Sequence, residues 1–336
     1  MKYTVTLIPG DGIGPEVTGA TCEILAAAGA PIEWETVHAG MRAFEQVGDA
    51  LPPSVIDSIR RNRVGLKGPL GTPKAGGFRS ANVRLRQALN LYTGWRPVIS
   101  LPGVASRFES VDLVVLRENT QGLYAGIEHQ VTEDTIVTLK VSSAEAGDRI
   151  ARWAFDHACN AGRRKITVCH KKSVLPSTDG AFVDAFFKVG KNYPFIEQSQ
   201  ITLDDLAMGL VQDPSDFDVL LLQNLYGDII SDLCAGLVGG LGVVPGANVG
   251  EQIAVFEAVH GTAPDIAGQG VANPLAVLMS GLLMMEFMGE RKIAERIREG
   301  IFIALQEGKH LTRDLGGTAN TAEFTAAIID AMPGAR

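Results

Sequence analysis

The chain has 336 residues, of which 46% are apolar and 20% charged, and its formal net charge is −8. This composition is typical of a globular protein with room for two core-bearing lobes, and it excludes a disordered chain. The acidic balance argues against a nucleic-acid partner, and the absence of any apolar run of roughly 20 uncharged residues argues against a membrane span.

Strand-like and helix-like segments alternate along the chain. The predicted strands are Tyr3–Ile8, Ile32–His38, Asp112–Leu116, Ile136–Val141, Ile166–His170 and Val219–Gln223. Helical patterns follow Pro15, Pro53, Ser80, Ser143, Asp179 and Gly227, and a nearly continuous one runs from Pro274 through Gln306. Such alternation predicts an α/β fold. Because no long linker interrupts it, we expect two lobes that share one continuous fold.

The glycines Gly10, Gly12 and Gly14 follow the first predicted strand and precede a helix. They resemble the Rossmann fingerprint, but the third glycine comes after one intervening residue instead of two. We therefore predict a tight turn that packs the strand on the helix, and not a dinucleotide site.

Four cysteines, Cys22, Cys159, Cys169 and Cys234, fall in apolar stretches without C-x-x-C spacing. Buried, reduced thiols are the expectation. A reducing compartment follows, so we predict a cytoplasmic protein, or a protein of the mitochondrial matrix if a transit peptide has been removed.

Cationic and polar side chains gather between residues 80 and 124. Three of the arginines in this interval, Arg86, Arg96 and Arg117, are typical of a site for a polycarboxylate, because the planar guanidinium matches a carboxylate in shape and stays charged. A helix is expected to begin near Ser80, so that its N-terminus adds to anion binding. The candidate substrate-binding residues are Ser80, Asn82, Arg86, Arg96 and Arg117, with Tyr124 close behind them.

Two aspartates, Asp228 and Asp232, stand four residues apart at the start of an apolar helix, so their carboxylates share one face. Oxygen ligands of this kind suit Mg²⁺ or Mn²⁺. An N-cap aspartate beside a solvated one is the alternative interpretation.

Further motifs occur along the chain together with these residues. They are Leu7 to Gly14, Lys67-Gly68-Pro69-Leu70, Ser80-x-Asn82-x-x-x-Arg86, Arg117-Glu118-Asn119-Thr120, Tyr124 to Glu128, Asn224 to Asp232, His260 to Asp265 and Asp314 to Gly317. Together the motifs cover nearly the whole chain, which resembles the β-decarboxylating dehydrogenases, the isocitrate/isopropylmalate dehydrogenase family. Within that family the chain is most similar to NAD-dependent isocitrate dehydrogenases.

The resemblance implies a two-domain, non-Rossmann α/β fold. A large cofactor-binding domain would comprise residues 1–91 and 239–336, and a small domain residues 92–238. A clasp at about 122–143 would join two subunits in a homodimer or a higher homo-oligomer with shared active sites.

The resemblance also implies the chemistry. Lys171, contributed across the dimer interface, would take the proton of the substrate hydroxyl, and Tyr124 would protonate the enolate carbon after CO₂ has left. Asp228, Asp232 and Asp204 of the other subunit would hold Mg²⁺ or Mn²⁺.

The cofactor segment implied by the resemblance comprises Thr72, His260, Gly261, Thr262, Ala263, Asp265, Ile266 and Asn273. Asp265 would accept a hydrogen bond from the ribose hydroxyls and repel a 2'-phosphate, so Asp265 and Ile266 favour NAD over NADP.

Substrate choice depends on Ser80 and Asn82, whose polar groups would be costly to bury against an alkyl group. Isocitrate is therefore favoured over 3-isopropylmalate, while homoisocitrate differs by only one methylene and stays an alternative. A hypothesis of another class is a non-catalytic regulatory subunit of a hetero-oligomeric NAD isocitrate dehydrogenase. The chain keeps the tyrosine, lysine and arginines that such subunits tend to lose, which favours an enzyme.

Overall fold

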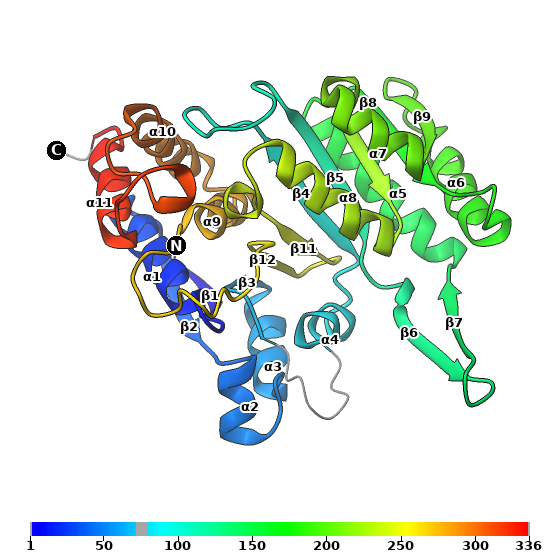
Figure 1. Cartoon of the computed structure of the whole chain (residues 1–336), viewed down its shortest axis with the longest axis horizontal. Coiled ribbons are helices and arrows are strands. Elements are labelled where there is room, and N and C mark those ends of the chain that lie inside the picture. The colour runs from blue at the N-terminus through cyan, green and yellow to red at the C-terminus, as the bar shows by residue number, and fades with distance from the viewer. Residues whose placement is uncertain (1, 72–79, 335–336) are drawn as a thin grey trace.

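The computed structural model describes residues 2–71 and 80–334. Within these ranges a ten-stranded sheet is covered by helices on both faces (Figure 1). The strand order is β2-β1-β3-β12-β11-β4-β5-β10-β8-β9, and a separate two-stranded sheet pairs β6 with β7. The prediction of an α/β fold is confirmed.

The strands are β1 (Tyr3–Ile8), β2 (Ile32–Thr36), β3 (Val64–Lys67), β4 (Thr93–Ile99), β5 (Asp112–Glu118), β6 (Gly122–Gln130), β7 (Ile136–Val141), β8 (Lys165–His170), β9 (Glu197–Thr202), β10 (Val219–Leu222), β11 (Ala247–Val249) and β12 (Ala254–Glu257). The helices are α1 (Gly14–Ala27), α2 (Met41–Val47), α3 (Pro53–Asn62), α4 (Ala81–Ala88), α5 (Ala144–Asn160), α6 (Pro176–Gly190), α7 (Leu203–Gln212), α8 (Asn224–Leu237), α9 (Leu275–Phe287), α10 (Arg291–Glu307) and α11 (Thr321–Ala331).

The large sheet consists of two parallel halves joined through antiparallel strands. β2, β1, β3 and β12 run parallel at one end, and β5, β10, β8 and β9 run parallel at the other. In the centre β11 is antiparallel to β12 and β4, and β4 is antiparallel to β5. The division into domains at residues 91 and 239 stays a prediction, and the sheet is continuous across it.

Helix α9 lies at the centre of the largest core cluster. Every residue from Leu275 to Met285 is buried, and α1 and α10 pack against this helix. A segment that is apolar all round is expected inside a fold, because no face of it gains from contact with water. No helix in the described part of the chain combines the length and hydrophobicity that crossing a bilayer requires.

Some predicted boundaries and burials are wrong. The helix predicted from Pro274 through Gln306 is interrupted between Phe287 and Arg291, because Gly289 adopts a φ of +87° that ends α9. Cys169 and Cys234 are buried, but Cys159 is exposed near the end of α5. It lies one position beyond Ala158, the last residue of the buried stripe of that helix.

Candidate active site

Helix α4 begins where the sequence predicts it. Ser80 is the N-cap residue, with φ −49° and ψ 129°, and its side chain makes no capping bond. Arg86 lies one turn beyond Asn82 and its Nε donates to the Asn82 carbonyl at 3.3 Å. The Oδ1 atom of Asn82 is buried without a hydrogen-bond partner among the described residues. A buried polar atom of this kind indicates a site that is completed by a ligand or by solvent.

The other two arginines lie inside the protein on neighbouring strands. Arg96 of β4 and Arg117 of β5 are 3% and 4% exposed. Burial and the charges of Arg86 and Arg117, opposed by Glu257, together lower the pKa of Arg96 to about 10. Burial and the charge of Arg86 also lower the pKa of Arg117. The three arginines therefore act on one another through space, and an anion near them would relieve their repulsion.

A buried polar network holds Arg96 in place. Its guanidinium donates to the Ala247 carbonyl at 2.7 Å and lies 3.5 Å from a carboxylate oxygen of Glu257. Glu257 also lies 2.7 Å from Lys67 Nζ and accepts a 2.6 Å hydrogen bond from Asn248. Burial opposes ionisation of Glu257, but the cations Lys67, Arg96 and Arg86 hold its pKa down at about 2. This carboxylate is thus a fixed counter-charge beneath the arginines.

Arg117, Tyr124 and Asp228 form the centre of the site. Arg117 donates to Asn224 Oδ1 at 2.7 and 3.0 Å and to a carboxylate oxygen of Asp228. The hydroxyl of Tyr124 donates to the other oxygen of Asp228, and the Arg117 guanidinium lies 4.9 Å from the Tyr124 ring centroid. Burial and the hydrogen bond to Asp228 raise the pKa of Tyr124, so its phenol keeps its proton at neutral pH.

The aspartate pair of α8 fits a cation in charge but not in ligand number. Burial and the neighbouring charge of Asp228 raise the pKa of Asp232, opposed by Arg117 and Arg96. A divalent ion would remove this repulsion between the carboxylates. Within the described residues, however, no three side chains of His, Cys, Asp or Glu come together as a metal-ligand set. The pair therefore needs a further ligand from a substrate, from water or from another chain.

Lys171 and Asp204 lie together at a second place. The Lys171 ammonium donates to the Asp204 carboxylate, and this bond lowers the pKa of Asp204. The backbone N–H of Lys171 donates to the buried Asp179 at 2.7 Å. Asp179 also accepts from Lys140 of β7 and from Tyr226 of α8, so it joins Lys171 to the hairpin and to the helix of the aspartates.

The turn at Gly10–Gly14 packs against the predicted cofactor segment. Ile13 N–H donates to the Thr262 carbonyl at 3.0 Å, and a Cβ at Gly12 would lie 2.0 Å from that oxygen. Glu16 of α1 accepts from the backbone N–H groups of Gly270 and Ala272 at 3.2 and 2.7 Å. The glycines thus allow strand, helix and loop to pack closely, as predicted for a packing turn.

His260 is the first residue of the predicted cofactor segment from His260 to Asn273. Its Nδ1 lies 2.9 Å from the Gly261 carbonyl, and its Nε2 is buried without a partner among the described residues. Burial lowers the pKa of this imidazole, so the ring is neutral at pH 7. Ala263 adopts a φ of +39°, which is uncommon for a residue with a Cβ. An orphaned nitrogen beside a tightly turned backbone fits a bound nucleotide.

The remaining cofactor candidates differ in their exposure. Gly261 and Asp265 are exposed, while Thr262, Ala263 and Ile266 are half-buried. Asn273 donates to Asp314 at 2.8 Å, and its side chain accepts from the first N–H group of α9, that of Leu275, at 2.9 Å. Thr72 lies outside the described residues.

The structure thus groups the predicted residues into three sets. Arg86, Arg96, Arg117, Tyr124 and the α8 aspartates form one set, Lys171 with Asp204 a second, and the segment from His260 to Asn273 a third. Sequence reasoning missed the residues that hold the first two sets, namely Glu257, Asn248, Asn224 and Asp179. Glu257 is a polar residue at the end of an apolar strand, Asn248 lies within one, and Asn224 and Asp179 lie in the first turns of α8 and α6.

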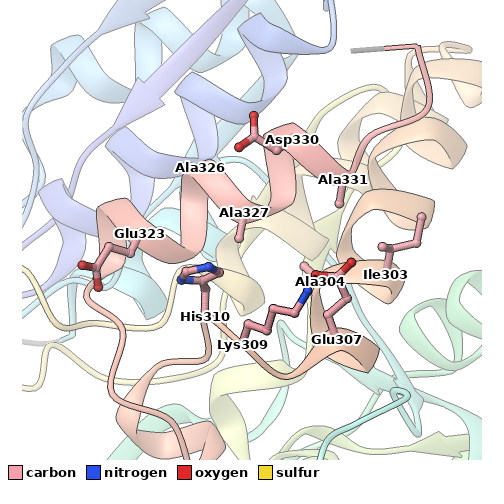
Figure 2. A pocket seen from close by; sticks show the side chains of 10 residues that line it. All are labelled: Ile303, Ala304, Glu307, Lys309, His310, Glu323, Ala326, Ala327, Asp330 and Ala331. Carbon is pink, nitrogen blue, oxygen red and sulfur yellow. Dashed lines mark hydrogen bonds and ion pairs between the residues drawn. The ribbon is translucent and has the colours of Figure 1, made fainter. Parts of the chain in front are cut away.

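A hollow of about 440 Å³ between α10 and α11 contains none of the predicted residues. Figure 2 shows alanines of α11 facing it and charged side chains such as Glu307, Lys309 and Asp330 around it. Both helices lie at the opposite end of the molecule from β8 and β9 (Figure 1).

Comparison with known proteins identifies the family. The sequence model for isocitrate/isopropylmalate dehydrogenase matches residues 4–328. The chain is 47% identical over 328 residues to the isocitrate dehydrogenase [NAD] catalytic subunit 5, mitochondrial, of Arabidopsis thaliana, covering 97% of this chain and 88% of the relative. It is 45% identical over 326 residues to a mitochondrial isocitrate dehydrogenase [NAD] regulatory subunit of Dictyostelium discoideum, covering 97% and 90%.

A solved structure agrees with these sequence relatives. The crystal structure of isocitrate dehydrogenase from Methylococcus capsulatus superposes with a TM-score of 0.95 at 46% identity, covering 98% of this chain and 99% of that one. The chain therefore belongs to the isocitrate/isopropylmalate dehydrogenase family.

Proposed function

We propose that this chain catalyses the oxidative decarboxylation of isocitrate to 2-oxoglutarate and CO₂, with reduction of NAD and with Mg²⁺ or Mn²⁺ bound. The observation that carries the proposal is the convergence of Arg86, Arg96 and Arg117 beside Tyr124 and Asp228. Three mutually repelling arginines suit a substrate with several carboxylates. The protonated phenol of Tyr124 beside them suits a reaction in which a carbon atom of the substrate must receive a proton. The names of the relatives, which are NAD-linked isocitrate dehydrogenase subunits, support the same substrate and coenzyme.

The side chains have separate tasks in this mechanism. The arginines bind the carboxylates of the substrate, Lys171 accepts the proton of the C2 hydroxyl as the hydride leaves C2, and Tyr124 donates a proton to the enolate carbon after CO₂ has departed. A divalent ion held by Asp228, Asp232 and the Asp204 of a second copy would polarise the C2 oxygen. The coenzyme would bind along His260–Asn273, with Asp265 selecting NAD.

Substrate choice is assigned to the start of α4. The unpartnered Oδ1 of Asn82 and the uncapped helix N-terminus at Ser80 are polar, and covering them with an isopropyl group would leave hydrogen bonds unmade. Isocitrate is therefore favoured over 3-isopropylmalate. Homoisocitrate stays the second candidate, because one methylene changes binding by only about 10- to 200-fold.

We also propose that two copies of the chain share their active sites. The hairpin β6–β7 projects from the body of the protein (Figure 1), and an isolated two-stranded sheet is marginally stable in water. Its apolar side chains are exposed: Ile127, Val131, Ile136, Val137 and Leu139. Met208 of α7 and Ile229 of α8 are exposed as well. A second copy that covers these surfaces would bring its Lys171 and Asp204 to the α8 aspartates.

A non-catalytic regulatory role is the competing assignment, since one similar protein is named as regulatory. Against it, the chain keeps Tyr124, Lys171, all three arginines and both α8 aspartates. As to location, the names of the sequence relatives reported above are mitochondrial, which supports the matrix and not the cytoplasm.

The test is NADH or NADPH formation by the purified chain with Mg²⁺, with isocitrate, homoisocitrate and 3-isopropylmalate offered separately. We expect the highest kcat/KM for isocitrate with NAD. Preference for homoisocitrate would keep the mechanism and overturn the substrate assignment.

A further inference from the structure

A second hollow, of about 570 Å³, lies on the other face of the central sheet from the arginines. Successive side chains of a strand point to opposite faces, so Trp95 and Arg96 of β4 face in opposite directions. Trp95 packs against Trp153 of α5, and their ring centroids are 6.1 Å apart. Residues of α5, α9 and α10, together with Val249 of β11, form the rest of the lining, and none of the predicted site residues is among them.

Aromatic rings form one wall of this hollow. The ring of His157 stacks on Trp153 at 5.0 Å with an angle of 9°, and it meets Trp95 edge-on at 5.0 Å. Burial lowers the pKa of His157 to about 4, so the imidazole is neutral and adds no positive charge at pH 7. Phe287, at the end of α9, lines the hollow and is 48% exposed. The faces of such rings attract flat aromatic groups and cations.

Acidic side chains surround the aromatic wall. Asp156, Glu286 and Glu295 line the hollow, and Arg291 is the one lysine or arginine among its lining residues in the described chain. Asp156 accepts from Tyr193, and Glu286 pairs with Arg298. Glu295 has no ion pair within the described ranges and is exposed. The excess of carboxylates disfavours phosphates and nucleotides and favours a positively charged ligand.

We propose that this hollow is a binding site for a small aromatic amine: a flat ring against Trp95, Trp153 and His157, with an ammonium group directed at Glu295. Its volume lies in the range of small-molecule sites. The proposal does not depend on the reaction at the other face of the sheet.

The test uses the intact protein with ¹⁵N-labelled tryptophan and 2-phenylethylamine as the probe. The chain has three tryptophans, and Trp34 of β2 lies outside the hollow. We expect the indole N–H signals of Trp95 and Trp153 to shift with a Kd of roughly a millimolar, while that of Trp34 stays in place. The anion 3-phenylpropionate, of similar size, is expected to bind at least about tenfold more weakly. Equal binding of amine and anion, or the absence of selective shifts, would overturn the proposal.

Two charge reversals on one helix locate the ammonium group. Glu295→Lys is expected to weaken 2-phenylethylamine by about three- to tenfold, because attraction at the rim becomes repulsion. Glu299→Lys, one turn further along α10 and also exposed, is the matched control and should leave the Kd unchanged. If both reversals weaken binding equally, the amine is held by the general field of the protein and the assigned site is wrong.

Discussion

Lys171 and Asp204 form an ion pair, and among the described residues no hydrogen bond or ion pair links either of them to Asp228 or Asp232. The proposed general base and the proposed metal ligand are thus held together, apart from the residues with which they would have to act. In the proposed homodimer with shared active sites, each chain would supply this pair to the α8 aspartates of the other.

Complementation tests this arrangement. Tyr124→Phe and Lys171→Met are each expected to be inactive when expressed alone. When the two variants are unfolded together and refolded, mixed dimers would contain one intact site, so about a quarter of wild-type turnover should return. Refolding each variant separately is the control. If the mixture stays inactive although mixed dimers form, Tyr124 and Lys171 do not act across the dimer interface.

Replacement of Lys171 tests the assignment of the base. Lys171→Met is expected to lower kcat by a factor of about 10² to 10⁴ and to leave isocitrate binding measurable by calorimetry, because the arginines are untouched. The matched control is Lys172→Met. Lys172 bonds the exposed Gln200 side chain at 2.9 Å, and its loss should change kcat little. Retention of more than about a tenth of the rate by Lys171→Met would refute the assignment.

Coenzyme preference is expected to depend on Asp265 and Ile266. The double variant Asp265→Lys with Ile266→Tyr should shift the ratio of kcat/KM for NADP over NAD by about 100-fold, because a hydrogen-bond acceptor is replaced by a partner for the 2'-phosphate. Asp265 is exposed, so the fold should tolerate the change. Asp265→Asn separates the two effects, since it removes the repulsive charge without adding a cation. An unchanged ratio in the double variant would show that another residue selects the coenzyme.

Glu257 is expected to control stability through the buried cations Lys67 and Arg96. Glu257→Gln should lower the free energy of unfolding by about 3 to 5 kcal/mol at neutral pH, because it leaves Lys67 buried without a counter-charge. The pKa of Glu257 falls from 4.5 to about 2 on folding, so its contribution is present above pH 4.5 and is lost as the pH falls toward 2. Urea unfolding of both proteins between neutral pH and about pH 3 should therefore show a shrinking difference. Glu251→Gln, at an exposed position, is the control; a difference that is constant with pH would contradict the account.

The sequence predicted those features that depend on local pattern. The start of α4 follows from apolar spacing after a break, and the shared face of Asp228 and Asp232 follows from their separation by four residues. The end of α9 was also readable, because Gly289 stands where a left-handed residue ends the helix. This end was not predicted, because the apolar helical pattern continues on both sides of Gly289.

The supports of the site were beyond sequence reasoning. Glu257 meets Lys67 and Arg96 only because β12 pairs with β3, and because β11 lies between β12 and β4. Asp179 of α6 contacts Lys171 in the turn after β8, Lys140 of β7 and Tyr226 of α8. Such contacts arise from strand order and packing, and neither residue belongs to a local pattern that indicates its partners.

The most direct test of the central claim is the initial rate of NADH formation from isocitrate and NAD by this chain purified alone, with Mg²⁺ and then with the metal chelated. We predict rapid turnover, in the range of about 1 to 10³ s⁻¹ typical of enzymes, that is abolished by chelation and restored by Mg²⁺ or Mn²⁺. Absence of turnover by the folded, metal-supplied protein would contradict the account.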